Sequence, residues 1–418
     1  MRFEPRPDFE FSEFYDTYFE RCADVCPKLA AIAAKWKYED LIPGLSDFDT
    51  RLIFHDGVSS EDWKQISVAV GRVHERLVRE RPEWARIMEH LPGPVLTVSE
   101  MTDPVFYYSE FHQWTFYRGD SDVITKIKKH LSGRSWDERD ELFFLKKFST
   151  YFGPYIHGID PPVNLGAWEN KYPLHSRFMH YFTPPLQSAL SIIHKRALAG
   201  KFESLRLARN LIDDSRVIDM ILDCVDRHYE VPAFFKEDRL REIETALLGY
   251  LEAVYEALSE YTSVARLSGT ESNAELKNIL SAIPVEAAAR FYDGVKFIRL
   301  IKGRLNFYAK DIEWFDSAWL IRNEFQRMGN NFYRSPFTVY GEHRFGEQLD
   351  PDVVVKRLVG SLIDEDEYEA VRRFIEIVDQ PIDRGGERER ASRVAELIDP
   401  IQDVLERVRG EIGGKVTE

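Results

Sequence analysis

The stretch of this chain that decides its fold reads Gly44-Leu45-Ser46-Asp47-Phe48-Asp49-Thr50-Arg51-Leu52-Ile53-Phe54. Alternate side chains of a β-strand point to opposite faces. Asp47 and Asp49 therefore point one way together with Arg51, whereas the residues between them, which are mostly apolar, point the other way. The pattern predicts a strand over 47–54 that buries one face and presents two carboxylates on the other. The preceding Pro43-Gly44 is typical of a turn, which places the pair at the start of the strand.

Two carboxylates at the start of a strand suit a divalent metal. Mg²⁺ prefers oxygen ligands and is usually bound through one or two protein carboxylates together with substrate phosphates. The pattern therefore predicts that Asp47 and Asp49 share Mg²⁺. The alternative is a solvated strand edge that carries two acids, because a D-x-D spacing is short and common.

The neighbouring segments predict an α+β fold with a small mixed sheet and helices, followed by a large all-helical region. We expect a helix over 10–34, a strand over 35–42 and long helical structure over 59–91. Strand-like runs follow at 94–99 and 105–117. These predictions depend on the period of the apolar residues, which is 3.6 in helices and two in strands.

The segment Ser46-Asp47-Phe48-Asp49, with a turn before it and an apolar strand end after it, resembles the paired-aspartate motif of the nucleotidyltransferase superfamily. The catalytic fold of that superfamily is shared with DNA polymerase beta. The resemblance covers roughly residues 20–130. It implies a Mg²⁺-dependent enzyme that moves a nucleotidyl group from a nucleoside triphosphate (NTP) to a small-molecule acceptor and releases pyrophosphate. It also implies that Asp47 and Asp49 are catalytic metal ligands and that Ser46 contacts the substrate.

The chain departs from the family pattern at the phosphate-binding segment. The family carries a Gly-Ser pair about ten residues before the first aspartate, where the backbone approaches the nucleotide phosphates. Here the corresponding residues are Ala34-Lys35-Trp36-Lys37-Tyr38-Glu39-Asp40, which include no Gly-Ser pair. Lys35 and Lys37 can supply positive charge to a phosphate instead. Arg51 can bind a phosphate or neutralise the two aspartates.

A third carboxylate is expected because two-metal phosphoryl transfer usually uses another acid as ligand or general base. The resemblance places it on a later strand, and Glu110 is the acid of the predicted strand 105–117. His112 lies on the same predicted face and is a candidate orienting or proton-accepting group at the substrate. Glu100 and Asp103 are alternatives to Glu110, because the strand register is not fixed by sequence. A salt-bridged acid beside a hydrogen-bonded histidine is the structural alternative.

Composition limits the partners and the compartment. The chain has 418 residues and a net charge of −15, which argues against nucleic acid as the main partner because that binding depends on basic surface. No apolar run approaches the ~18 residues of a membrane helix, and the N-terminal residues show no apolar signal region. We therefore expect no membrane segment and a cytoplasmic location. Cys22, Cys26 and Cys224 are too few for a disulfide framework and are expected to be reduced.

The length of the chain predicts more than one domain. We expect a nucleotidyltransferase-like catalytic domain at 1–134, a helical domain at 135–330 and a C-terminal helical section at 331–418. The first boundary is suggested by Ser135 with Glu138 three residues later, which is the pattern of a helix capping box. Two other functions remain open: a catalytically inactive binding protein with the same fold, and an enzyme of another reaction type that uses the same carboxylate pair.

Overall fold

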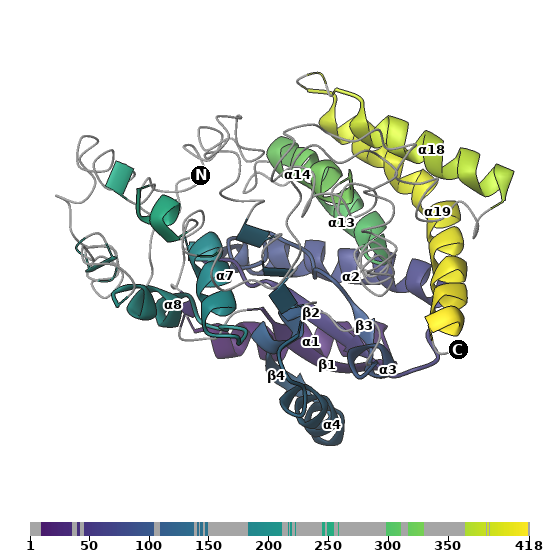
Figure 1. Ribbon diagram of the computed structural model, residues 1–418. Coiled ribbons are helices and arrows are strands. Elements are labelled where there is room, and N and C mark those ends of the chain that lie inside the picture. The colour runs from purple at the N-terminus through teal and green to yellow at the C-terminus, as the bar shows by residue number, and fades with distance from the viewer. Residues whose placement is uncertain are drawn as a thin grey trace.

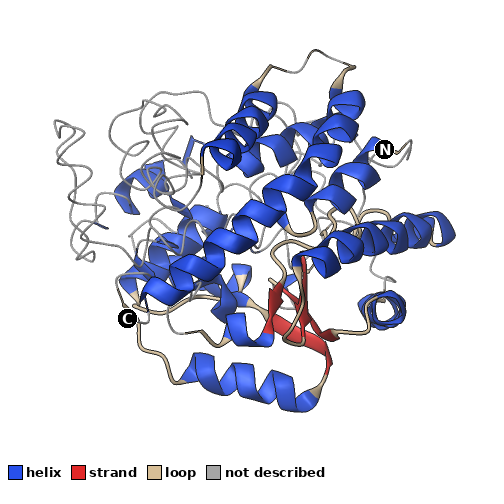
Figure 2. Cartoon of the chain, turned by 90° about the vertical axis from the view of Figure 1, so that its right-hand side faces the viewer, coloured by secondary structure: helices blue, strands red, loops and turns tan. Residues whose placement is uncertain are grey.

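The computed structural model shows a mixed α+β fold in which four short strands lie among many helices (Figures 1 and 2). It describes residues 10–35, 40–41, 46–103, 109–137, 140–141, 143–144, 147–148, 183–210, 216, 218–219, 222, 245–246, 249–254, 258, 298–310, 317–329, 364–381, 383 and 385–416. The statements below concern these residues.

The N-terminal part contains the sheet and its helices. The order is α1 (Phe11–Val25), β1 (Leu29–Ala34), β2 (Thr50–Phe54), α2 (Ser60–Glu80), the 3₁₀ helix η2 (Pro82–Trp84), β3 (Leu96–Thr97), α3 (Val98–Met101), the 3₁₀ helix η3 (Ser109–Gln113), β4 (Thr115–Gly119) and α4 (Ser121–Ser132). The longer described helices that follow are α7 (Thr183–Ile193), α8 (Lys201–Ala208), α13 (Ile301–Ala309), α14 (Ser317–Gly329), α18 (Glu365–Asp379) and α19 (Glu387–Val416).

The sheet has the strand order β3-β2-β1-β4. Strand β1 pairs antiparallel with both β2 and β4, and β2 pairs parallel with β3. All residues of β1 and β2 are buried, so the two central strands are covered on both faces. At the far end of β4, Gly119 has φ 141° and a Cβ there would lie 2.4 Å from the carbonyl oxygen of Ala30. Only glycine fits this close approach between the two strands.

Helix α2 begins at a capping box formed by local sequence. The Ser59 hydroxyl accepts a hydrogen bond from the Asp62 amide at 3.1 Å, and the Asp62 carboxylate accepts one from the Ser59 amide at 2.8 Å. These bonds satisfy amide groups that have no partner within the helix. The helix then crosses α13 with close backbone contact, because a Cβ on Gly303 would lie 2.0 Å from the carbonyl oxygen of Ser67.

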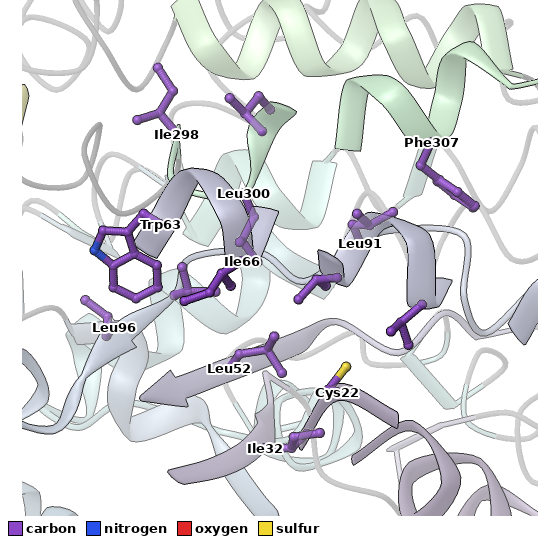
Figure 3. Packing of buried hydrophobic residues seen from close by; sticks show 14 of the residues in the cluster. Cys22, Ile32, Leu52, Trp63, Ile66, Leu91, Leu96, Ile298, Leu300 and Phe307 are labelled. Atoms are coloured by element: carbon purple, nitrogen blue, oxygen red, sulfur yellow. The ribbon is translucent and has the colours of Figure 1, made fainter. Parts of the chain in front are cut away.

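One hydrophobic core joins the sheet to the C-terminal helices. It runs from Phe11 in α1 to Val404 in α19, and Figure 3 shows part of it. In that view Leu52 of β2 and Trp63 of α2 lie in the same cluster as Phe307 of α13. Helix α13 packs against both α2 and α19, as Figure 1 also shows. The expected division into three domains stays a prediction, although α13 and α19 bury their apolar surface against the N-terminal part.

Several predicted boundaries around the sheet are wrong. The predicted helix 10–34 ends at Val25, and Leu29–Ala34 forms β1 instead. Pro27 explains the end of the helix, because proline disfavours the helical conformation of the residue before it. The next strand does not occupy 35–42, since Lys35 is a bend and Asp40 and Leu41 are not in a strand. Residues 36–39 and 42 lie outside the described residues.

The remaining strand predictions were too long. Strand β2 begins at Thr50, so Asp47 and Asp49 precede it. In the predicted strand 94–99, only Leu96–Thr97 is strand, because Thr97 and Glu100 form a capping box that starts α3. In the predicted strand 105–117, residues 109–113 are the 3₁₀ helix η3 and β4 starts at Thr115. Part of that range, residues 104–108, lies outside the described residues.

The helical predictions were more accurate. Helix α2 forms within 59–91 but ends at Glu80, just before Pro82. The expected C-terminal helical section contains α18 and α19, and Gly385-Gly386 lies between them. Helix α19 continues to Val416. Among the described residues, no helix is both long enough and apolar enough to cross a membrane.

Candidate functional site

Asp47 and Asp49 lie in an extended segment directly before β2. Phe48 between them is buried, and its amide donates a hydrogen bond to the carbonyl of Ile87 at 2.9 Å. Its ring packs against the rings of Phe14 and Tyr117. The two carboxylates keep contact with solvent, with 19% of the Asp47 side chain and 29% of the Asp49 side chain exposed. The predicted alternation therefore holds at these three residues even though they precede the strand.

The backbone of Asp49 is fixed by two cationic residues. The Lys35 amide donates to the Asp49 carbonyl at 3.2 Å, which extends the pairing of β1 and β2 by one step. Nη1 of Arg51 donates to the same carbonyl at 3.1 Å and lies 3.9 Å from Oδ1 of the Asp49 carboxylate. Asp49 thus lies beside the positive charge of Arg51 while its carboxylate remains partly exposed.

Glu110 lies on η3 instead of the expected strand, and it is buried among cations. Its Oε1 accepts hydrogen bonds from Nη2 of Arg51 at 3.0 Å and from the Trp114 indole at 3.0 Å. Its Oε2 lies 3.4 Å from Nζ of Lys35. Burial by itself raises the pKa of Glu110, but the charges of Lys35, Arg51 and Lys147 and the indole hydrogen bond outweigh it and lower the pKa. Glu110 is therefore ionised at neutral pH, and Arg51 links it to Asp49.

Asp47 has a histidine neighbour that sequence reasoning missed. Nε2 of His90 lies 3.6 Å from Oδ2 of Asp47 and 3.2 Å from Oε1 of Glu89. The other ring nitrogen, Nδ1, is 3.2 Å from the hydroxyl of Tyr308 on α13. Glu89 is fully buried and also pairs with Arg86. Both ring nitrogens of His90 therefore have partners, and the ring connects Asp47 to Tyr308 on α13.

Two further lysines interact electrostatically with Asp49, and one of them also with Asp47. Lys201, the first residue of α8, is buried, and its charge interacts with those of Asp47 and Asp49. Burial lowers its pKa, and the aspartates and Asp40 oppose that shift. Lys147 has its pKa lowered by burial and by the charge of Lys35, against the opposing charges of Glu110 and Asp49.

Three further residues were predicted to bind the substrate: Ser46, His112 and Lys37. Ser46 is buried directly before Asp47. His112 is on η3, and the charged groups that act on it are Asp140, Arg134 and His130 instead of the aspartates. Lys37 lies outside the described residues.

The alternative acid Glu100 has a structural role. Its carboxylate pairs with Arg299 at 2.7 and 2.8 Å and accepts the Thr97 amide at 2.8 Å. These bonds join α3 to the segment before α13. In the other alternative, Asp103, the backbone amide donates a hydrogen bond to the carbonyl of Glu100 at 3.4 Å.

The two carboxylates of Asp47 and Asp49 suit a metal ion that takes most of its ligands from water and substrate, not from protein side chains. Within the part of the chain that the structure describes, no three His, Cys, Asp or Glu side chains are grouped so that they could hold a metal. Two part-exposed carboxylates suit Mg²⁺, which keeps waters and substrate phosphates in its shell. They do not resemble the closed nitrogen and sulfur sites of zinc.

No family model matches this chain, and no curated protein or solved structure was found to be similar to it. The function is therefore argued from the geometry of the site. The missed residues His90, Lys147 and Lys201 belong to no sequence motif. Only the pairing of distant segments brings them to the aspartates.

Proposed function

We propose that this chain is a Mg²⁺-dependent nucleotidyltransferase that moves a nucleotidyl group from an NTP to a hydroxyl of a small-molecule acceptor. The observation that carries the proposal is the pair of part-exposed carboxylates directly before a buried strand, with Arg51 beside Asp49 and the ammonium group of Lys35 beside Glu110, which Arg51 binds. An NTP needs both kinds of group, since carboxylates hold the metal and cations offset the phosphate charge.

The small sheet and the helices around it support a nucleotidyltransferase-like catalytic fold. The negative net charge of the chain favours a small acceptor over nucleic acid. The cytoplasm, where NTPs and Mg²⁺ are abundant, is the compartment that this reaction requires. A membrane has no part in it.

In the proposed reaction the acceptor oxygen bonds to the α-phosphorus, and the bond from that phosphorus to the oxygen bridging to the β-phosphate breaks. Pyrophosphate leaves, and the acceptor proton passes to solvent or base. Asp47 and Asp49 would hold Mg²⁺, which supplies charge neutralisation and orientation of the phosphates. Arg51 fixes the Asp49 backbone, and Glu110 holds Arg51 in place. In this arrangement Glu110 positions the cations and is a poor proton acceptor, because its lowered pKa makes the carboxylate a weak base.

The test is ligand-dependent stability. A ligand that binds only the folded state raises the unfolding midpoint. We expect an NTP to raise the midpoint in the presence of Mg²⁺ and to give pyrophosphate on incubation with a mixture of hydroxylated metabolites. Asp47→Asn and Asp49→Asn should each abolish the part of the NTP-induced rise in unfolding midpoint that depends on Mg²⁺. Asp122→Asn, a surface acid in the first turn of α4, is the matched control and should behave as wild type.

The opposite result is equally informative. If no NTP raises the midpoint with or without Mg²⁺, the proposal is overturned in favour of a binding protein with the same fold or an enzyme of another reaction type. The absence of a Gly-Ser pair would then account for the failure to bind an NTP.

A further inference from the structure

The segment between η2 and β3 is joined by two backbone hydrogen bonds to the segment that carries the aspartates. The Phe48 amide donates to the Ile87 carbonyl at 2.9 Å. Further along, the Gly93 amide donates to the Thr50 carbonyl, also at 2.9 Å. Asp49 lies between the two bonded residues, so the chain is fixed on both sides of this aspartate.

Gly93 leaves room for the guanidinium group of Arg51. Nη1 of Arg51 donates to the carbonyls of Asp49 and Thr50, each at 3.1 Å. A Cβ on Gly93 would lie 2.5 Å from this Nη1 and 2.9 Å from Cζ of the same guanidinium. Both distances are too short for a real contact, so any side chain at this position would push the guanidinium away from the two carbonyls. Glycine is therefore required here by the close approach of Arg51.

The other edge of the Arg51 guanidinium is held by Glu110. Nε and Nη2 of Arg51 donate to Oε1 of Glu110 at 3.3 and 3.0 Å, and both side chains are buried. Four hydrogen bonds to protein acceptors thus occupy a group that has five N–H donors. This arrangement suits Arg51 to hold the backbone at Asp49 in place, and it leaves little of the guanidinium for direct contact with a phosphate.

We infer that Arg51 is a positioning residue for Asp49 in the metal site, and that Gly93 is needed because it admits the guanidinium group. Arg51 binds the backbone on both sides of the peptide bond that follows Asp49, and its Nη1 lies 3.9 Å from Oδ1 of that aspartate. It thereby fixes the direction in which the Asp49 carboxylate leaves the chain, so that Asp47 and Asp49 can meet at one ion. The inference rests on the proposed function for the metal, but not for the reaction.

The charge of Arg51 and its position have opposite effects on a bound metal. A positive charge 3.9 Å from a carboxylate opposes the binding of a cation there, so its displacement alone would tighten metal binding. Positioning predicts the reverse, because loss of a partner that orients a metal ligand typically costs tenfold or more in metal affinity. The sign of the change therefore distinguishes the two roles.

The probe is Mn²⁺ without any nucleotide, with free Mn²⁺ measured by electron paramagnetic resonance. Mn²⁺ takes the same oxygen ligands as Mg²⁺. Gly93→Ala should weaken Mn²⁺ binding about tenfold although it leaves the charge of the chain unchanged. Gly386→Ala is the matched control, because its added Cβ would meet only the Asp383 carbonyl oxygen, at 3.3 Å. The control should bind Mn²⁺ within about twofold of wild type.

Arg51→Lys separates charge from geometry. Lysine keeps the positive charge but is a point charge on a flexible stem, and it cannot bind two carbonyls and Glu110 at once. This variant should also bind Mn²⁺ about tenfold more weakly than wild type. The double variant Gly93→Ala/Arg51→Lys should bind within about twofold of Arg51→Lys alone, since Gly93 acts through a guanidinium that is no longer present. If Gly93→Ala does not unfold cooperatively, Arg51→Lys decides.

The inference is overturned if either folded single variant binds Mn²⁺ as tightly as wild type or more tightly, or if the two losses add in the double variant. Failure of the proposed function gives different results. The expected Mn²⁺ pattern without NTP turnover removes the reaction and keeps the positioning role. NTP turnover with wild-type Mn²⁺ binding in both variants removes the positioning role and keeps the reaction. If wild type shows no Mn²⁺ binding that Asp49→Asn abolishes, both are overturned.

Discussion

Arg51 binds Glu110 through two nitrogens, with Nε at 3.3 Å and Nη2 at 3.0 Å from the same carboxylate oxygen. Both side chains are buried, so this ion pair is screened little by solvent. The pair connects η3 to β2 and lies directly behind the Asp49 carboxylate, which is 3.9 Å from Arg51. The acid that the resemblance suggested as a third metal ligand is thus already occupied by protein cations.

Comparing Glu110→Gln with Asp49→Asn distinguishes a structural role of Glu110 from a metal-binding role. We expect Glu110→Gln to lower the free energy of unfolding by about 3 kcal/mol or more, because Arg51 and Lys35 lose a buried counter-charge. Below the new unfolding temperature, the Mg²⁺ concentration needed for half-maximal NTP binding should change less than about threefold. Asp49→Asn should show the reverse pattern, with little loss of stability and loss of Mg²⁺ dependence. A Glu110→Gln variant that loses Mg²⁺ dependence as completely as Asp49→Asn would restore Glu110 as the third carboxylate.

Local signals explain which parts of the fold were predictable. The capping box of Ser59 and Asp62 specifies the start of α2, and this helix formed. Of the predicted strand 47–54, only Thr50–Phe54 formed, directly after the alternation around Phe48. Strand β1 was not predictable, because Leu29–Ala34 is rich in alanine and alanine favours helices. It becomes a strand because β2 and β4 pair with it on either side, and such pairing is not visible in a local window.

The same distinction holds at the site. Asp47 and Asp49 were found because their spacing is a local pattern. His90 and Lys201 were missed because a lone histidine in a turn and a lone lysine at a helix start resemble ordinary surface residues. Tertiary packing buries both beside the aspartates, His90 through Tyr308 and Lys201 through Asp40.

The crossing of α2 and α13 should tolerate no side chain. Gly303→Ala places a Cβ 2.0 Å from the backbone oxygen of Ser67, which cannot move without shifting the helix. We expect the variant to lose about 3 kcal/mol of unfolding free energy or more, as overpacked cores do. Gly249→Ala is the control, because Gly249 is helical with no atom within 4 Å of its added Cβ, and it should be neutral or stabilising by up to ~1 kcal/mol. Chemical denaturation measures both, and equal stability of the two variants would contradict the crossing geometry.

Acid should destabilise the protein through His74. Burial lowers the pKa of this residue from 6.5 to about 3, partly offset by a bond of Nε2 to the Met88 carbonyl at 2.6 Å. Below pH 6.5 the unfolded chain binds a proton at His74 that the folded chain does not, so stability falls as pH falls. This group contributes about 1.4 kcal/mol per pH unit down to about pH 3.

His74→Gln removes this titration and keeps a donor for the Met88 carbonyl. Its unfolding free energy, measured by urea denaturation between pH 7 and 4, should therefore depend on pH less steeply than that of wild type. The two proteins should differ in slope by about 1 kcal/mol per pH unit, a little below the full single-proton value. Parallel curves would show that His74 is not kept neutral by the fold.

The hydroxyl of Tyr308 should matter for the metal although it lies on α13, in the helical part of the chain. It is 3.2 Å from Nδ1 of His90, and a hydrogen bond there directs the opposite ring nitrogen to Asp47 and Glu89. Partners of this kind orient ligating carboxylates, and their loss typically costs tenfold or more in metal affinity. Tyr308→Phe should therefore raise the Mg²⁺ concentration needed for half-maximal NTP binding about tenfold, with little change once Mg²⁺ is saturating.

Tyr250→Phe is the matched control, since the Tyr250 hydroxyl also makes a buried hydrogen bond, to the Ala208 carbonyl at 2.7 Å. A merely structural role predicts that both variants lose stability alike and leave the Mg²⁺ dependence unchanged, whereas a shift confined to Tyr308→Phe assigns His90 to the orientation of Asp47.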